Sequence, residues 1–369
     1  MGSYRGALGY RGTEVIASWL PLYHDMGLIA CFMMPLVAGG TIVSLDAFEW
    51  VSKPIMLAAA IETYRAQWCW LPNFAFAHMA RARRPSETHD LSSIRAFIIC
   101  SEPCKAETFA TFASTFADCG VRPEQLQVCY AMAETVFAVT QTPIGEPILP
   151  ARFSSAGLMA GRCEPAVEGE PAATFLPTGR PVRGMELRVC DMDDNDLPDG
   201  QVGQIAARCD FLFSGYYRLP EATAEAFAGS WFRTGDLGFM LDGELYVTGR
   251  LKDVIIVHGK NIYAHDVEAL VSGLEGVKPG RAVAVGAYNA RMGSEDLVII
   301  CETDTADPDV SRQLQRMIRS SVEAHFGLSG VVAKLVASGW MLKTTSGKVS
   351  RKENLAKFLS ERAERQEIA

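Results

Sequence analysis

The sequence lacks several features by which common classes of protein are recognised. None of its ten cysteines forms a Cys-x-x-Cys pair, so a metal site built from paired thiolates is not expected. It has no basic stripe and a net charge of −8, and because a nucleic-acid surface needs such a stripe, we expect no nucleic-acid partner. No basic and then apolar leader opens the chain. These absences together predict a reduced, cytoplasmic protein with buried thiols.

One long run without any charge is present, at residues 26–45. A run of this length could cross a bilayer as a helix. Pro35 and the Gly39-Gly40 pair, however, divide it into a helix-like part and a β-branched part. We therefore predict two buried elements joined by a turn, and no membrane span.

Strand-like and helix-like segments alternate in the first part of the chain. The candidate strands lie at 41–45, 96–100, 126–130 and 185–190, and the helix-like stretches include 52–65 and 106–120. This order predicts an α/β fold with parallel βαβ units over residues 15–140. Residues 143–181, rich in Pro, Gly and Ala, predict an irregular insertion, after which short antiparallel strands follow. A smaller α+β unit is expected from residue 251 onward.

A Gly-Lys pair near the C-terminus, in "LKTTSGKVSRKENL" at 342–355, raises the question of a phosphate-binding P-loop. That pattern needs a glycine five positions before Gly347 and a hydroxyl residue after Lys348. Leu342 and Val349 stand there instead, so the P-loop is excluded. Lys348 on a small loop still requires another explanation.

Four polar clusters, at 23–27, 130–135, 232–236 and 249–253, lie where the predicted strands and helices end. Ligands of open α/β sheets collect at the carboxyl ends of strands, which makes the cluster after strand 126–130 the most informative. Taken singly, each has an ordinary structural explanation. Glu134 suits a helix N-terminus, Asp236 a turn, and His24 a capped loop.

The order of these clusters along the chain resembles that of the acyl-adenylate-forming ligases, in particular the fatty acyl-AMP ligase branch. The segments that carry the resemblance are "SWLPLYHDMGLI", "LPNFAF", "CSEPC", "YAMAET", "GQIAARCDFLFSGYYRLPEAT", "WFRTGD", "TGRLKDVIIVHGKNIYAHDVE" and "TTSGKVSR". It covers nearly the whole chain from about residue 15 onward. The resemblance implies a large adenylation domain at 1–249, truncated at its N-terminal end, and a mobile C-terminal domain at 250–369.

The resemblance also implies a role for each matching residue in joining a carboxylate to the α-phosphate of ATP. Glu134 would hold Mg²⁺, Thr135 would hydrogen-bond the α-phosphate, and His24 would lie near the phosphates and the acyl entrance. Asp236 would accept bonds from the ribose hydroxyls, with support from Arg250. The adenine would be framed by Ser101, Glu102, Pro103 and Tyr130, with Tyr130 stacked on it. Ala131 and Met132 stand where the family has Gly-x, and we expect them to tighten this site.

Two lysines are assigned by the same resemblance. Lys348 would swing in to bridge carboxylate and phosphate oxygens, a task suited to a point charge on a flexible stem. Lys252 falls at the hinge, where a change of backbone torsions would rotate residues 253–369 between two poses.

The sequence departs from the family in one important respect. The glycine- and hydroxyl-rich loop that wraps the β- and γ-phosphates is absent, and only 23 residues precede His24. One interpretation is an ATP-dependent enzyme that activates a fatty or other apolar acid to acyl-AMP, in which the missing N-terminal region is either supplied by a second polypeptide or dispensable for a reduced reaction. The other is an impaired ligase remnant that binds nucleotide, acyl-adenylate or a carrier protein.

Substrate and acceptor remain open at this point. Residues 72–80, "PNFAFAHMA", are consistent with a long apolar acyl pocket and equally with core packing. The insertion at 143–181 resembles the one that, in acyl-AMP ligases, restrains the C-terminal domain and disfavours coenzyme A. An acyl carrier protein thiol is therefore the expected acceptor, and an acyl-CoA ligase is the alternative.

Overall fold

The computed structural model describes residues 1–100, 104–278, 280–289, 292–305, 307–343 and 349–367. The chain forms two compact units. The first unit comprises Met1–Ser154 and Cys163–Thr248, and the second comprises Ser155–Arg162 and Gly249–Ala369. The main chain therefore passes from one unit to the other three times, after Ser154, Arg162 and Thr248.

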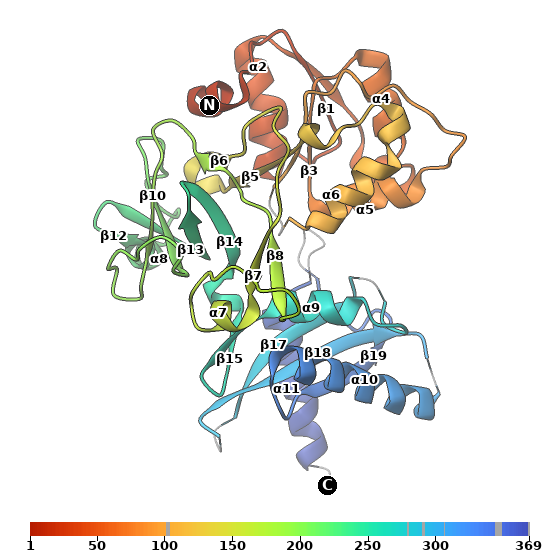
Figure 1. The fold of residues 1–369 in the computed structure, drawn as a ribbon, viewed down its shortest axis with the longest axis vertical. Coiled ribbons are helices and arrows are strands. Elements are labelled where there is room, and N and C mark those ends of the chain that lie inside the picture. Colours follow the sequence, from red (N-terminus) through yellow and green to blue (C-terminus); the bar gives the residue numbers. More distant parts are fainter. Residues whose placement is uncertain (101–103, 279, 290–291, 306, 344–348, 368–369) are drawn as a thin grey trace. The chain divides into compact units, whose positions relative to one another are not determined.

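A seven-stranded sheet forms the centre of the first unit, in the order β2-β1-β3-β4-β5-β6-β9 (Figure 1). Its strands are β1 (Val15–Ser18), β2 (Thr41–Ser44), β3 (Trp68–Leu71), β4 (Ala96–Ile99), β5 (Leu126–Ala131), β6 (Ala138–Gln141) and β9 (Arg180–Pro181). Strands β1 to β5 pair in parallel, and β6 and β9 pair antiparallel. The predicted α/β class with parallel βαβ units is confirmed.

Helices cover both faces of this sheet. They include α1 (Gly2–Leu8), η1 (Met26–Met33, π-helical), α2 (Met34–Ala38), α3 (Ala47–Ser52), α4 (Met56–Tyr64), α5 (Asn73–Ala82) and α6 (Ala106–Thr115). The β3–β4 register puts Trp70 and Phe97 on opposite faces. Phe97 packs against Phe76 of α5, with ring centroids 6.4 Å apart, and Trp70 packs against Tyr4 of α1 at 6.3 Å. Because both faces are covered, the central strands β3 and β4 are continuous apolar runs, and β5 is interrupted only by the buried Gln127 near its start.

The uncharged run 26–45 does form a helical part and a strand. In the helical part, Met26, Ala30 and Cys31 are buried, and Gly39 ends α2 in the left-handed conformation with φ +87°. The expectation that both parts are buried is wrong for β2, because this outer strand leaves Thr41 and Ser44 exposed. None of the helices in the described part of the chain combines the length and the apolar character that a bilayer crossing requires.

Two sequence-based boundaries need correction. The predicted helix 106–120 ends as an α-helix at Thr115 and continues as a 3₁₀ turn, η2 (Ala117–Cys119), before Gly120. The stretch 143–181 is more regular than predicted. Strands β7 (Ala151–Ser154) and β8 (Ala172–Phe175) pair antiparallel, and helix α7 (Ser155–Met159) lies between them in sequence.

The rest of the first unit is rich in antiparallel strands, as predicted. Its five-stranded sheet contains β10 (Glu186–Cys190), β11 (Gly203–Arg208), β12 (Phe227–Ala228), β13 (Trp231–Leu241) and β14 (Glu244–Arg250). Helix α8 (Pro220–Ala226) precedes β12.

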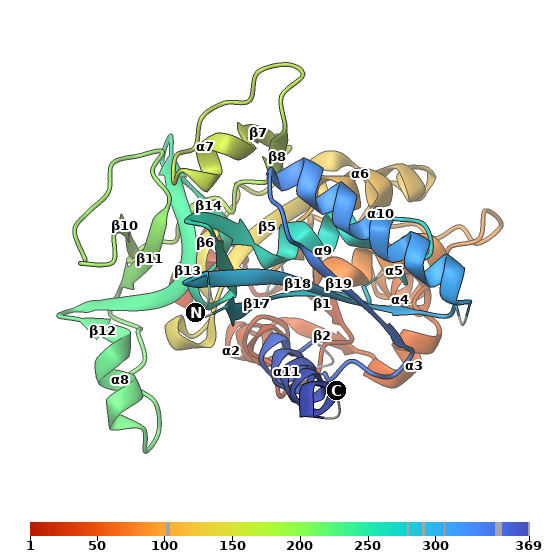
Figure 2. The ribbon, with the colours of Figure 1, turned by 90° about the horizontal axis from the view of Figure 1, so that it is seen from below.

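The second unit is an α+β sandwich. A hairpin of β15 (Val254–Val257) and β16 (Lys260–Tyr263) accompanies a sheet of β17 (Ala282–Asn289), β18 (Ser294–Thr303) and β19 (Val332–Ala337), with helices α9 (Ala264–Ser272), α10 (Pro308–Phe326) and α11 (Arg351–Glu367). Alternate residues of β18 enter different cores: Ile299 packs with α9 and α10, whereas Ile300 packs with Phe358 of α11. Helices α10 and α11 accordingly lie on opposite sides of this sheet (Figure 2).

Candidate active site

The parallel strands bring several predicted residues to one edge of the first unit. Because β1, β3, β4 and β5 run in the same direction, the segments that follow them begin at the same carboxyl edge. His24 follows β1, and Glu134 follows β5. Ser101, Glu102 and Pro103 come after β4 in sequence and lie outside the described residues, as does Lys348.

Tyr130 and Asp236, 106 positions apart in sequence, meet through their side chains. The Tyr130 hydroxyl donates to Asp236 Oδ2 at 2.6 Å, a short bond to an ionisable acceptor. Asp236 is only 8% exposed, so its carboxylate is held where solvent has little access. A hydrogen bond therefore connects Tyr130, which is predicted to stack on the adenine, to Asp236, which is predicted to bind the ribose hydroxyls.

A bulge in β13 directs Asp236 toward this contact. Between the pairs Gln204–Leu237 and Ala206–Arg233, three residues of β13 oppose the single residue Ile205. Gly235 adopts φ +73° within the bulge, a conformation that favours glycine. The Thr234 hydroxyl donates to the Ile205 carbonyl at 2.8 Å and accepts from the Asp236 amide at 3.1 Å. In this segment Gly235 allows the bend, Thr234 fixes it by hydrogen bonds, and Asp236 provides the carboxylate.

Glu134 lies on the 3₁₀ turn η4 (Ala133–Thr135), directly after β5. Its carbonyl accepts from the Phe213 amide at 2.8 Å, and its Oε1 accepts from the Tyr216 hydroxyl at 3.0 Å. Burial and the nearby charge of Glu134 raise the pKa of Tyr216 to about 12. Tyr216 is therefore a neutral donor at ordinary pH and holds the Glu134 side chain.

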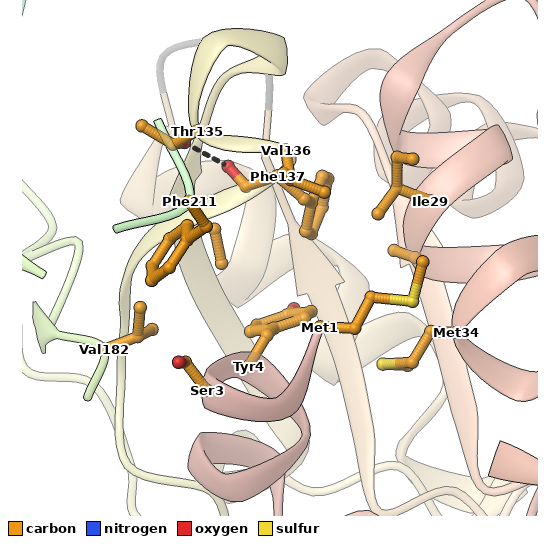
Figure 3. A pocket seen from close by; sticks show the side chains of 12 residues that line it. Met1, Ser3, Tyr4, Ile29, Met34, Thr135, Val136, Phe137, Val182 and Phe211 are labelled. Atoms are coloured by element: carbon orange, nitrogen blue, oxygen red, sulfur yellow. Dashed lines mark hydrogen bonds between the residues drawn. The ribbon is translucent and has the colours of Figure 1, made fainter. Parts of the chain in front are cut away.

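Thr135 is buried, with its hydroxyl turned toward its own chain. Its Oγ1 lies 3.1 Å from the carbonyl oxygens of both Met132 and Phe137, and the single proton can be donated to only one of them. Val136, the next residue, has φ +68°, which is strained for a β-branched side chain. Figure 3 shows Thr135 and Phe137 at the rim of an apolar pocket that Met34, Phe211 and other residues line.

His24 lies in the bend directly before the helical segment η1, whose N-cap is Asp25. Its Nδ1 lies 2.7 Å from Asp25 Oδ1, and its carbonyl accepts from the Leu28 amide at 2.8 Å. The side chain is about one-third exposed, at 31%. His24 therefore combines a structural role directly before the start of η1 with an imidazole that solvent can reach.

The remaining predicted residues divide between the two units. Ala131 ends β5, and the Met132 amide donates to the Phe137 carbonyl at 2.8 Å. Arg250 and Lys252 belong to the second unit and are exposed. For the segment 72–80, the structure favours the core interpretation, because the buried Phe76 packs against aromatic rings of β4 and α6.

Sequence reasoning missed several polar residues. Tyr216 stood inside a quoted segment, "SGYYRLPEAT", and a hydroxyl-bearing aromatic residue there was the available signal. In the second unit, Arg351 donates from Nη1 to Asp253 Oδ2 at 2.8 Å and from Nη2 to Glu268 Oε2 at 2.7 Å. The separation of these residues in sequence hides that cluster.

Comparison with known proteins gives a consistent result. The family described as AMP-binding enzyme matches residues 2–217. The long-chain-fatty-acid–AMP ligase FadD28 of Mycobacterium tuberculosis (strain H37Rv) is 32% identical over 365 residues, which cover 92% of this chain and 61% of that protein. The putative fatty-acid–CoA ligase fadD25 of the same strain is 30% identical over 374 residues, covering 95% of this chain and 63% of that protein.

A solved structure from studies of fatty acyl-adenylate ligases from E. coli and L. pneumophila matches the fold with a TM-score of 0.89. It is 26% identical and covers 97% of this chain and 64% of the other. The chain thus spans less than two thirds of the length of these relatives.

Proposed function

Because the chain belongs to the family of AMP-binding enzymes, we propose that it activates a fatty or other apolar carboxylic acid as an acyl adenylate. A carboxylate oxygen attacks the α-phosphorus of ATP, the bond from that phosphorus to the bridging oxygen breaks, and pyrophosphate leaves. The observation that carries this proposal is the hydrogen bond between Tyr130 and Asp236, which ties two nucleotide-binding candidates to each other. Catalysis of this kind relies on positioning and on electrostatic stabilisation.

The nucleoside would be held at the carboxyl edge of the sheet. In this proposal Tyr130 stacks on the adenine, and the Asp236 carboxylate accepts from the ribose hydroxyls while Tyr130 keeps it oriented. Arg250 adds a charge near the ribose. The other residues proposed to frame the adenine are Ser101, Glu102, Pro103, Ala131 and Met132.

Magnesium fits the donor set at Glu134. The described residues contain no group of three His, Cys, Asp or Glu side chains that would hold a metal alone. Mg²⁺ is usually bound by one or two carboxylates together with substrate phosphates, which a single glutamate next to Thr135 satisfies. When bound, the ion would neutralise phosphate charge. Tyr216 would orient Glu134 for this purpose, and Thr135 would hydrogen-bond the α-phosphate.

The acyl chain needs an apolar site near the phosphates. The pocket in Figure 3 lies beside Thr135 and is lined mainly by apolar side chains, among them Ile29, Met34 and Phe137, but its free volume of about 20 Å³ would have to expand before an acyl chain could enter. Burial of apolar surface contributes about 25 cal/mol per Å², so a greasy chain would gain affinity there. His24 would stand at the entrance.

The charge that develops on the reacting oxygens would be met by Lys348 from the second unit. In this proposal residues 1–249 form the adenylation domain and residues 250–369 rotate as a mobile domain about Lys252. An exposed Lys252 between β14 and β15 suits a hinge, since its side chain can move without loss of core packing.

For the acceptor we propose a carrier-protein thiol. Helix α7, from the insertion 143–181, belongs to the second unit, and Met159 packs against that unit's apolar core. An insertion held in this way would restrict the rotation of residues 250–369. This supports a restrained acyl-AMP ligase over an acyl-CoA ligase.

The ATP site would be completed by a stretch of polypeptide outside these 369 residues that carries the glycine-rich phosphate loop. Outer strand β2 supports such a neighbour, because the apolar side chains Leu36, Val37 and Phe48 on the flanking helices α2 and α3 are exposed. An outer strand with such surroundings is a site for pairing with a further strand.

ATP–pyrophosphate exchange with medium- and long-chain fatty acids tests the proposal. We expect weak exchange by this chain alone, abolished in Lys348→Ala and retained in Lys352→Ala, which removes an exposed lysine of α11. Exchange that is strong and indifferent to Lys348→Ala would refute the mechanism. Binding of acyl-adenylate without any exchange would identify a ligase remnant, and ready formation of acyl-CoA would refute the proposed acceptor.

A further inference from the structure

The hairpin loop at residues 133–136 joins β5 to β6 and carries Glu134 and Thr135. The Met132 amide donates to the Phe137 carbonyl at 2.8 Å and closes the hairpin on either side of this loop. The 3₁₀ turn η4 makes up the loop as far as Thr135, and Val136 is its last residue. The backbone of Val136 therefore sets the direction in which the chain returns from η4 to β6.

Val136 has an unusual backbone conformation for its residue type. Its φ of +68° and ψ of −51° lie close to those of the classic γ-turn, which is rare and strained. In the described part of the chain, the other non-glycine residues with positive φ are arginine, aspartate or histidine, and Val136 alone is β-branched. Glycine or asparagine normally takes such a position. A residue of poor local fit thus stands in the loop that is proposed to contact phosphate and metal.

Hydrogen bonds within the loop hold Val136 in this conformation. Its amide donates to the Ala133 carbonyl at 2.9 Å. The Thr135 hydroxyl lies 3.1 Å from the carbonyl oxygens of Met132 and Phe137, one on each side of the loop. A rotation of Val136 to negative φ would move Phe137 relative to Thr135 and disturb these contacts.

The loop is also anchored to the rest of the first unit. Phe137 is 2% exposed and packs edge-on against Tyr4 of α1, with ring centroids 5.2 Å apart. The Phe213 amide donates to the Glu134 carbonyl at 2.8 Å. Strained conformations persist only where the surrounding contacts over-determine them, and they cluster at functional sites. The contacts of this loop meet that condition.

A valine restricts the loop more than a glycine would. Glycine populates positive and negative φ about equally, whereas a side chain with a Cβ leaves few allowed combinations of backbone torsions. The Val136 side chain is half-buried and lines the apolar pocket beside Thr135 and Phe137 (Figure 3). Once its surroundings hold Val136 at positive φ, few neighbouring conformations are open to it.

We propose that Val136 is a positioning residue that holds Glu134 and Thr135 in the geometry required by Mg²⁺ and the α-phosphate. This inference rests on the roles proposed above for those two residues. Groups that are fixed before the substrate arrives lose little entropy when it binds, so a rigid loop lowers the barrier more than a mobile loop does. The strain at Val136 then lowers stability in favour of function.

The test compares Val136→Ala with Val136→Gly in the full chain. Both variants remove the branched side chain from the pocket, but alanine keeps the restriction on positive φ and glycine abolishes it. We expect Val136→Gly to melt about 2–4 °C above Val136→Ala, because its backbone is unstrained. Its kcat for ATP–pyrophosphate exchange should nevertheless be about 10- to 100-fold lower than that of Val136→Ala. KM for the fatty acid should shift equally in both variants, since both alter the pocket.

Asp242→Gly provides a matched control. Asp242 also has a positive φ, of +53°, and is exposed on the turn between β13 and β14. A glycine there relieves the same kind of strain away from Glu134 and Thr135, so this variant should retain kcat.

A second readout separates positioning from altered packing. Amide hydrogen exchange at Met132 and Thr135 should be faster in Val136→Gly than in Val136→Ala, although the glycine variant is the more stable one. If Val136 served stability alone, activity would follow stability and the glycine variant would be the faster enzyme. Equal kcat in the two variants, or a faster glycine variant, would overturn this inference alone. A wild-type chain that neither exchanges pyrophosphate nor binds an acyl-adenylate analogue would overturn the proposed function and the inference with it.

Discussion

Replacing Tyr130 by phenylalanine removes the hydroxyl oxygen and keeps the aromatic ring that is proposed to stack on the adenine. In the structure that hydroxyl donates to Asp236 Oδ2 at 2.6 Å, and Asp236 is nearly buried. The variant therefore deprives a carboxylate of one donor without altering the volume of the site. We expect the protein to fold normally and to bind acyl adenylate more weakly, because Asp236 is no longer held in position for the ribose.

The size of this loss follows from the nature of the bond. A hydrogen bond to a charged group contributes about 1.5–3 kcal/mol, and each 1.4 kcal/mol changes affinity tenfold, so the possible range is roughly 10- to 150-fold. Tyr130 is only half-buried, and water can replace part of the lost donation. We therefore expect a loss near the lower end, about tenfold.

Calorimetric titration with a non-hydrolysable acyl-adenylate analogue measures this loss. The set comprises the wild type, Tyr130→Phe, Asp236→Ala and the double variant, with Tyr10→Phe as a control that removes a buried hydroxyl bonded to the Glu14 carbonyl. Without the carboxylate, the Tyr130 hydroxyl has no role in binding, so the double variant should match Asp236→Ala. Wild-type affinity in Tyr130→Phe, or losses that simply add, would refute the reasoning.

Two further predictions concern pH and stability. Because the folded-state pKa of Tyr216 is raised by burial and by Glu134 to about 12, above its ordinary value of 10.0, the stability from its neutral form is present below pH 10 and lost as pH rises through about 12. A spectrophotometric titration of Tyr216→Phe should lack one tyrosine that ionises late in the wild type, and identical curves would contradict the assignment. Phe112→Ala should cost about 3–5 kcal/mol of unfolding free energy in urea, because Phe112 is fully buried among aromatic rings. Phe74→Ala, at 47% exposure, should cost much less, and equal costs would count against this account of the core.

Much of the fold follows from local patterns. The strand at 96–99 is an unbroken apolar run and the strand at 126–131 is apolar except for Gln127, which suits strands covered on both faces, and the boundaries of both are predicted to within one residue. The burial of β2 was predicted wrongly because its composition resembles that of a central strand, whereas its exposure depends on its place in the sheet. The order of strands is a property of the whole sheet and leaves no periodic signal in one segment.

The candidate site divides in the same way. The order of the motifs identifies Tyr130 and Asp236 as candidates. Their contact depends on a bulge in which three residues of β13 lie opposite one residue of β11, and the pattern of side chains does not reveal such a bulge. Asn354 lies in a helix rich in charged residues, and this sequence context predicts an exposed asparagine. In the structure its side chain is buried instead, because the main chain at Leu342 and Ser350 folds back onto α11.

Helix α7 has a consequence for how the protein is made. It is synthesised with the middle of the first unit, yet Met159 packs into a core whose other members come from Gly249 onward. At roughly 5–20 residues per second, about 10–40 seconds separate the synthesis of this helix from completion of the chain. During translation the apolar side chain of Met159 therefore stays exposed until the residues that it packs against have been synthesised. A recombinant fragment that begins at Gly249 would lack Met159, and the apolar side chains that Met159 covers would be exposed to solvent. A soluble version of the second unit should therefore carry residues 155–162 on a linker.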